Sequence, residues 1–202
     1  MDNSLLKDVL SLFAIVDPIG AIPLFLTLTN GLSNSVQLSI ARRAAFSGFI
    51  ILLFVLFFGK WFLEFMGISL PSLRVAGGLL FIIMGLQLML LENQKSHYDD
   101  ILNRSDISVV PLAIPMLSGP GAMGAVILLG SSGVGIYSLL STSLIIGVVM
   151  FLSYLCFRLS QKIGSKLGST GLNILSKVSG LIVVSIGVEF IINGIKQMWF
   201  MI

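Results

Sequence analysis

Two carboxylates stand inside apolar stretches of this sequence, where an ionisable side chain is costly. Asp17 lies within residues 5–28, and Glu189 lies within residues 174–195. A charge at the centre of a bilayer costs about 2.5–3.5 kcal/mol on insertion scales, so such a side chain should face a cavity or a partner. We therefore expect Asp17 to bind a proton or a cation, to cap the N-terminus of a half-helix that starts at Pro18, or to do both.

Glu189 shares a helix face with Asn193, which follows it by four residues. A carboxylate in this place either relays protons or binds a cation, or it is a structural charge that Asn193 satisfies. The amide one turn away favours the structural role. Both residues, with Asp17, remain candidates for proton or ion coupling.

Proline and glycine interrupt two apolar stretches, at Pro18, Gly20 and Pro23 in residues 14–25 and at Pro111, Pro115, Gly119, Pro120 and Gly121 in residues 111–122. Proline lacks an N–H and clashes with the preceding turn, and glycine relaxes the backbone, so each helix should break. Half-helix N-termini at the breaks would present unbonded N–H groups and a positive dipole end, which suit a carboxylate or another anion. The structural alternative is a pair of kinks that only shape packing.

Interrupted apolar segments at corresponding places of two halves indicate a substrate site near the membrane midplane. The predicted substrate-binding residues come from both interruptions. They are Asp17, Pro18, Gly20, Ala21, Ser118, Gly119, Pro120 and Gly121.

These residues must be positioned by membrane-spanning helices. A helix needs about 20 apolar residues to cross the hydrocarbon. Six stretches qualify, namely residues 5–28, 44–66, 73–91, 109–129, 139–159 and 174–195. The sequence therefore predicts an all-α integral membrane protein with one transmembrane domain over residues 1–202 and a long polar loop at residues 92–108.

Composition supports the membrane assignment and excludes several functions. Hydrophobic residues make up 56% of the chain and charged residues 10%, whereas soluble domains carry roughly 25% charged residues. Lipid is therefore the expected partner, and the net charge of +3 indicates no nucleic acid. With one cysteine, Cys156, and one histidine, His97, we expect no disulfide, metal or other cofactor. The absence of catalytic signatures argues against an enzyme.

Basic residues at the ends of the spans predict the orientation. Six spans place both termini on one side, which carries Lys7, Lys60, Arg74 and Lys196. The opposite side carries twice as many, namely Arg42, Arg43, Lys95, Arg104, Arg158, Lys162, Lys166 and Lys177. Because basic residues favour the cytoplasmic side, both termini are expected outside, in the periplasm.

The two halves, about residues 1–91 and 109–202, repeat at a constant offset. Pro18 and Pro120 lie 102 residues apart, and the same offset relates Gly78 to Gly180, Gly85 to Gly187 and Gln87 to Glu189. Each half holds three spans, and a duplicated unit with an odd number of spans inserts in opposite senses. The sequence thus predicts two inverted three-helix repeats in which helices 1 and 4 are broken.

Four of these glycines predict a packing seam. Gly78 and Gly85 are seven residues apart, as are Gly180 and Gly187. Seven residues make nearly two turns, so each pair lies on one helix face, and small residues let helices approach closely in lipid. Such a seam would also allow two chains to form a homo-oligomer.

Several segments resemble signatures of the MarC family of bacterial membrane proteins, within the LysE-like exporter group. Residues 17–25 resemble its first-helix motif (N/D)PxGNxPxF, and residues 67–78, 110–121 and 187–195 resemble the signatures of its third, fourth and last helices. The chain differs at Ala21, where the family commonly has Asn, and at Glu189, where Gln is frequent. The resemblance implies an inner-membrane protein with six helices, and some members are described as carriers of small neutral amino acids.

The leading hypothesis is a secondary transporter or exporter of a small zwitterionic solute, such as a neutral amino acid, coupled to H⁺ or Na⁺. The solute carboxylate would dock on the half-helix N–H groups, and Asp17 would accept a proton, a cation or the solute ammonium. One alternative is an intramembrane enzyme that uses Asp17 and Glu189 as an acid pair. Another is an accessory membrane protein without transport, in which protein side chains fill both breaks.

Overall fold

The computed structural model describes residues 2–90, 108–131 and 136–199, and every element in these ranges is a helix. In chain order they are α1 (Asp2–Val16), α2 (Ile22–Leu28), α3 (Asn34–Phe54), η1 (Val55–Gly59), α4 (Lys60–Met66), α5 (Leu70–Leu90), η2 (Ser108–Leu117), α7 (Pro120–Ser131) and α8 (Ile136–Trp199). The all-α class is confirmed. The predicted polar loop lies outside the described residues, apart from Ser108.

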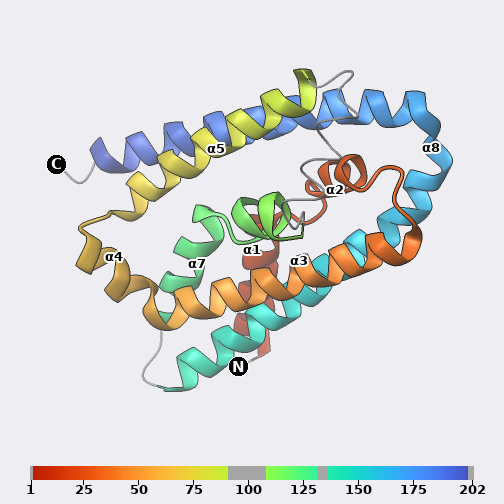
Figure 1. The fold of residues 1–202 in the computed structure, drawn as a ribbon. Coiled ribbons are helices and arrows are strands. Elements are labelled where there is room, and N and C mark those ends of the chain that lie inside the picture. Colours follow the sequence, from red (N-terminus) through yellow and green to blue (C-terminus); the bar gives the residue numbers. More distant parts are fainter. Residues whose placement is uncertain (1, 91–107, 132–135, 200–202) are drawn as a thin grey trace.

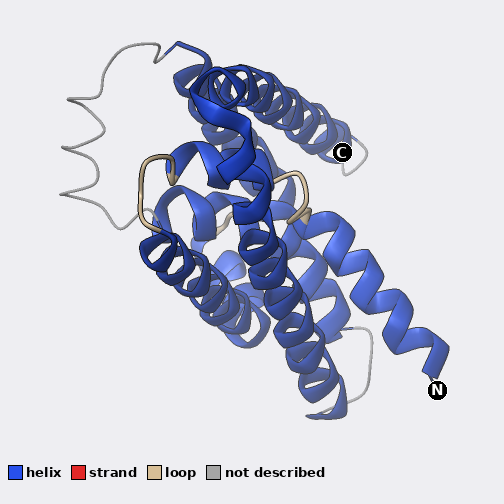
Figure 2. Ribbon diagram, turned by 90° about the vertical axis from the view of Figure 1, so that its right-hand side faces the viewer, coloured by secondary structure: helices blue, strands red, loops and turns tan. Residues whose placement is uncertain are grey.

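The helices form two long antiparallel pairs with shorter helices between them (Figure 1). Helix α5 runs along the C-terminal part of α8, and α3 runs along its N-terminal part. Helices α2, η2 and α7 and the C-terminal end of α1 lie between the pairs, whereas the rest of α1 passes behind the α3–α8 pair. Figure 2 shows α1 extending away from the rest of the bundle toward the N-terminus.

Three helical stretches in the described ranges are long and apolar enough to cross a membrane, at Asn34–Met66, Ile136–Gln161 and Lys177–Trp199. Two shorter apolar helices accompany them, at Leu70–Leu86 and Pro120–Gly130. The second predicted span therefore begins at Asn34, ten residues before its predicted start. Helix α3 includes Arg42 and Arg43, which precede the predicted start of this span at residue 44.

The last two predicted spans belong to one helical element, α8, which bends sharply between them (Figure 1). The polar stretch at residues 162–173 contains no proline. Nothing in its covalent structure therefore stops the helix, although its polarity ends the apolar span.

The outer surface is apolar, as lipid requires. Phe46, Phe65, Leu140 and Leu144 are all more than 60% exposed. Two tryptophans and a tyrosine, Trp61, Trp199 and Tyr137, are also exposed. They lie at helix ends that share one side of the molecule, at the left of Figure 1. Because Trp and Tyr gather at membrane–water interfaces, we expect this side to lie at one membrane surface.

The predicted glycine seam is confirmed between α5 and α8. A Cβ added to Gly78 would lie 2.5 Å from the carbonyl oxygen of Gly187, and one added to Gly187 would lie 2.6 Å from that of Gly78. Gly85 and Gly180 meet in the same way, at 2.6 and 2.7 Å. The two backbones are therefore in direct contact, and no larger residue fits at either crossing.

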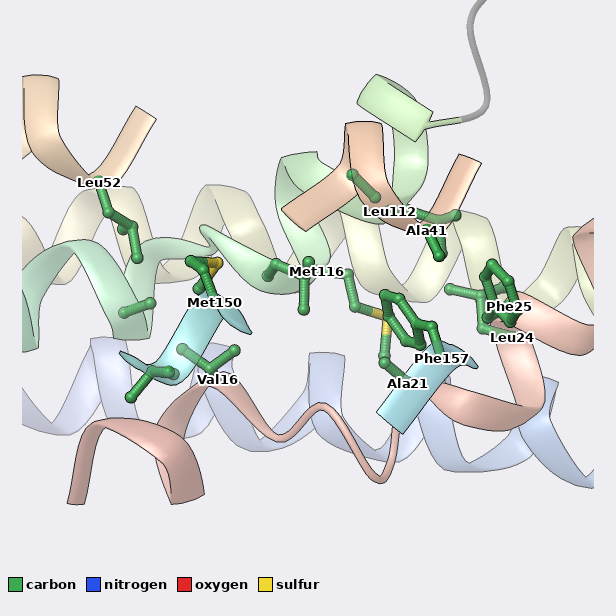
Figure 3. Packing of buried hydrophobic residues seen from close by; sticks show 14 of the residues in the cluster. Val16, Ala21, Leu24, Phe25, Ala41, Leu52, Leu112, Met116, Met150 and Phe157 are labelled. Carbon is green, nitrogen blue, oxygen red and sulfur yellow. The ribbon is translucent and has the colours of Figure 1, made fainter. Parts of the chain in front are cut away.

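Core residues flank the first break, with Val16 before it and Leu24 and Phe25 after it (Figure 3). Phe25 of α2 stacks on Phe157 of α8 with ring centroids 4.7 Å apart, which fixes the chain beyond the break. Buried hydroxyls bond to carbonyls of their own helix, as Thr29 does to Phe25 at 2.7 Å and Ser153 to Val149 at 2.8 Å. These polar groups are thus satisfied without water, as an interior in lipid demands.

Candidate functional site

The first break, residues 17–21, turns on Asp17. Helix α1 ends with the Asp17 amide donating to Phe13 O at 2.9 Å, and Asp17 then takes a left-handed φ of 44°. Few residues other than Gly, Asn and Asp adopt this conformation readily. The Asp17 carboxylate accepts the Gly20 amide at 3.0 Å. Helix α2 begins only at Ile22 and has no side-chain cap, so Asp17 closes the turn before the helix and does not cap a helix that starts at Pro18, as the sequence had predicted.

The amides of the first break bond within the break itself. Besides the Gly20 amide, the Ala21 amide donates to Asp17 O and the Ile22 amide to Ile19 O, both at 3.1 Å. Pro18 has no N–H to offer. In this conformation, therefore, the first break presents a carboxylate to its surroundings rather than a set of unbonded amides.

The second break, Ser118 and Gly119, follows the irregular helix η2. Pro111 and Pro115 remove two backbone donors from η2, and its turns are of the wider π type. The amide and the hydroxyl of Ser118 both donate to Ala113 O, at 2.9 and 2.8 Å. A Cβ on Gly119 would overlap Pro115 O, so glycine is required where the chain leaves η2.

Helix α7 begins at Pro120, so its first-turn amides point back toward the second break. Met123 is the first residue of α7 whose amide donates to a carbonyl four residues earlier, that of Gly119, at 2.9 Å. The amides of Gly121 and Ala122 precede it and have no acceptor within the helix. This half-helix N-terminus favours an anion, and Gly121 and Ala122 both line the cavity described below.

Close packing fixes this N-terminus against three other helices. A Cβ on Gly77 of α5 would overlap the ring of Pro120. A Cβ on Gly121 would lie 3.3 Å from both Ile15 of α1 and Phe190 of α8. The absence of side chains at two glycines therefore brings the second break to the end of α1, beside the first break.

A partly open cavity of about 460 Å³ lies where the two breaks meet, within the usual size range of small-molecule sites. Its wall is mostly apolar. The lining residues are Ala14, Ile15, Val16, Asp17, Arg74, Phe81, Pro115, Met116, Gly119, Gly121, Ala122, Ala125, Leu128, Ile186, Glu189, Phe190 and Asn193.

Four polar side chains line this cavity. Asp17 comes from the first break, Arg74 from α5, and Glu189 and Asn193 from α8. Asn193 Nδ2 donates to Glu189 Oε1 at 2.9 Å, so the structure contains the bond that the spacing predicted. Phe81 and Phe190 meet edge to face with centroids 5.5 Å apart and form part of the apolar wall.

The residues predicted to bind substrate, or to couple transport to a proton or an ion, divide into two sets. Five candidates line the cavity, namely Asp17, Gly119, Gly121, Glu189 and Asn193. The other five, Pro18, Gly20, Ala21, Ser118 and Pro120, lie outside its wall. Pro18, Ala21, Ser118 and Pro120 are buried, and they shape the backbone that carries the first set.

Among the four polar side chains that line the cavity, Arg74 is the one that sequence reasoning missed. It was counted as a topological charge because it lies near the start of a predicted span. The signal was present, since Arg74 follows Pro71 by three residues and therefore lies inside a helix that Pro71 helps to start. In the part of the chain that the structure describes, no three His, Cys, Asp or Glu side chains gather to hold a metal ion.

Comparisons with known proteins agree with this membrane architecture. A family model described as MarC family integral membrane protein matches residues 3–199. A UPF0056 membrane protein of Buchnera aphidicola is 39% identical over 197 residues, which cover 96% of this chain and 92% of that relative. The UPF0056 membrane protein YvbG of Bacillus subtilis is 38% identical over 94% of this chain and 93% of its own.

The similarity reaches other bacteria as well. The UPF0056 membrane protein YhcE of Escherichia coli is 33% identical over 94% of this chain and 91% of its own length. No solved structure matches the chain. The relatives are named only as membrane proteins, and no name among these three describes an enzyme. Because the family model and these relatives cover nearly all of its length, this chain belongs to the MarC family of integral membrane proteins.

Proposed function

We propose that this protein is a secondary transporter of a small zwitterionic solute, most simply a neutral amino acid, in the cytoplasmic (inner) membrane. The observation that carries the proposal is the cavity into which both broken helices open. Carriers bind solutes at the meeting point of discontinuous helices, near the middle of the membrane. Charges of both signs line an otherwise apolar cavity here, which suits a zwitterion with a small apolar side chain.

The glycine seam supports the inverted repeat that such a mechanism uses. Helix α5 closes the first proposed repeat, and the C-terminal part of α8 closes the second. The contacts join Gly78 to Gly187 and Gly85 to Gly180, so the equivalent helices run antiparallel. Repeats inserted in the same sense would pair Gly78 with its counterpart Gly180. An antiparallel arrangement is what inverted repeats require.

The binding mode follows from the two breaks. The solute carboxylate docks beside the N-terminus of α7, where the amides of Gly121 and Ala122 have no acceptor within the helix. The solute ammonium, or a coupling H⁺ or Na⁺, binds at Asp17, which uses one carboxylate oxygen to accept the Gly20 amide. Glu189 and Asn193 complete the polar lining on α8.

The two alternatives have less support. An accessory protein without transport predicted that side chains fill the breaks, but a cavity of about 460 Å³ opens there. An acid-pair enzyme would use Asp17 and Glu189, which do share the cavity. Each of these carboxylates already accepts a local hydrogen bond, from the Gly20 amide and from Asn193. Those bonds suit fixed binding groups better than a proton-sharing pair.

Transport is tested in proteoliposomes that contain the purified protein. Uptake of labelled alanine, glycine and serine is measured with an imposed proton gradient, with a sodium gradient and with neither, against protein-free liposomes. We expect accelerated uptake of at least one of these amino acids, and counterflow when the vesicles are preloaded with it. A folded protein that gives neither uptake nor counterflow under any gradient would refute the proposal.

A further inference from the structure

We infer that Arg74 is the residue that binds the carboxylate of the transported solute, and that Arg74 and the cavity carboxylates together select zwitterions. The inference rests on the proposed transport function and names its main specificity determinant. Arg74 lies one turn inside α5 and is half-buried, and it lines the cavity between the two breaks.

The guanidinium of Arg74 lies beside the start of α7. Its Nη2 atom is 3.8 Å from the position that a Cβ on Gly124 would occupy, four residues after α7 begins. The N-terminus of a helix carries a partial positive charge, which disfavours a cation beside it. The guanidinium and the positive end of α7 therefore repel each other across the cavity. An anion bound between them would offset this repulsion, because it attracts both groups.

The protein itself supplies little compensation for this charge. Within residues 2–90, 108–131 and 136–199, no ion pair or hydrogen bond engages Arg74. The two cavity carboxylates accept donors of their own, the Gly20 amide for Asp17 and the Asn193 side chain for Glu189. An arginine within a membrane protein is costly without a partner. A carboxylate brought by the solute is the partner whose geometry matches the guanidinium, because it accepts two parallel N–H groups.

Selection for a zwitterion follows from the remaining charges. The cavity holds one guanidinium and two carboxylates, so a solute with only a carboxylate leaves Asp17 and Glu189 without an ammonium partner. A solute with only an ammonium leaves Arg74 unpaired. Phe81 and Phe190 provide an apolar wall, which suits a small aliphatic side chain.

This role also removes an inconsistency in the charge distribution. Arg74 was one of four basic residues on the side predicted to face outward, against eight on the other side. A guanidinium that lines a cavity is not a loop charge. Three residues then remain on the outward side, so the bias toward the predicted orientation becomes stronger.

The test measures binding of labelled alanine to the full-length protein in lipid nanodiscs, with Arg74→Gln, Arg74→Lys and Lys60→Gln as variants. Lys60 is an exposed basic residue outside the cavity, so Lys60→Gln is the matched control. We expect Arg74→Gln to weaken alanine binding roughly tenfold or more, as the loss of a charge-assisted pair does. Arg74→Lys should weaken it less, and Lys60→Gln should leave it unchanged.

Competition by alanine amide and by propionate identifies the group that Arg74 binds. Alanine amide lacks the carboxylate, and propionate lacks the ammonium. In the wild type both should compete roughly tenfold or more weakly than alanine, whereas in Arg74→Gln the difference between alanine and its amide should disappear. A merely structural role for Arg74 would not change this ratio. If Arg74→Gln does not fold, the ratio of the alanine amide affinity to the alanine affinity is measured in Arg74→Lys instead. The preference for alanine over its amide should decrease there as well.

The outcomes separate the two proposals. Suppose that the wild type transports alanine and that Arg74→Gln binds alanine with unchanged affinity and selectivity. The role of Arg74 is then wrong, and the proposed transport stands. If Arg74→Gln does not fold, Arg74→Lys decides in the same way. If propionate competes as well as alanine in the wild type, the selection of zwitterions is wrong. If the wild type transports none of the three amino acids, the proposed function itself fails, and this inference fails with it.

Discussion

At the scale of the residue, Asp17 combines a structural bond with a charge that faces the cavity. Its backbone φ of 44° and its bond to the Gly20 amide at 3.0 Å are needed for the turn, whereas its negative charge is not. Asparagine tolerates the same left-handed backbone and offers an oxygen of the same shape. The structural and functional contributions of this side chain are therefore separable by substitution.

Replacing Asp17 by Asn and by Ala separates them. Asp17→Asn should keep the wild-type thermal stability but lose most solute uptake, because the bond to Gly20 remains and the charge does not. Asp17→Ala should lose uptake and also about 1 kcal/mol of stability, the usual cost of a lost cap. Thermal unfolding in detergent and proteoliposome uptake measure the two effects. Normal uptake by Asp17→Asn would exclude the charge from the mechanism.

Gly20 tests the same turn from the other side. A Cβ at this position would overlap the Asp17 carboxylate, which must then give up the Gly20 amide. Gly20→Ala should therefore destabilise the protein by about 1 kcal/mol in the wild-type background, and by much less in the Asp17→Ala background. The double-mutant cycle is measured by thermal unfolding. Equal costs in both backgrounds would show that the carboxylate is not what requires glycine here.

At the scale of the element, the seam between α5 and α8 allows no side chain at its crossings. Gly78→Ala would place a Cβ 2.5 Å from a backbone oxygen and 2.7 Å from Ile191 Cγ1, so the helices must separate. We expect a loss of about 1–3 kcal/mol, as overpacked interiors show. Gly147→Ala in α8 is the control, because its Cβ would lie 3.6 Å from Phe49, an ordinary contact. Equal unfolding temperatures for the two variants would contradict this prediction.

Local chemistry explains which elements were predictable. Pro18 and Pro120 interrupt hydrogen bonding wherever the helix lies, so the two breaks could be read from the sequence, and α1 and η2 end beside them. The continuity of α8 could not be predicted in this way, because the polar residues 162–173 end an apolar stretch without preventing a helix. The early start of α3 was missed for the same reason. Hydropathy shows which residues can lie in the hydrocarbon, but it does not show where the helix itself begins.

The site was only partly predictable, because a cavity depends on how elements pack. Asp17 and Glu189 stood out as charges inside apolar stretches. Arg74 did not, because its role depends on Gly77 of α5 receiving the Pro120 ring and bringing α7 next to the guanidinium. No spacing along the sequence encodes that contact. The bonding of the first-break amides within their own turn was likewise not visible in the residue types.

At the scale of the whole molecule, the proposed orientation predicts which positions reagents reach. Lys196 lies in the last turn of α8, whereas Lys177 is the first residue of the last apolar stretch, Lys177–Trp199, and therefore lies at its opposite end. In a Cys156→Ser background, Lys196→Cys should react with an impermeant maleimide in intact cells. Lys177→Cys should react only after the cells are permeabilised, because the bend faces the cytoplasm. The reverse pattern would invert the topology.

The glycine seam also limits how the molecule can change shape. Its two crossings lie seven residues apart, which is about 10 Å along a helix. Bare backbones that touch at two such points resist sliding, because any axial shift drives a neighbouring side chain into a carbonyl oxygen. They still permit a small tilt about the line of contact. In the proposed transport cycle, the seam would be the pivot between the two halves of the chain, and a tilt that opens the cavity toward one face of the membrane would close it toward the other.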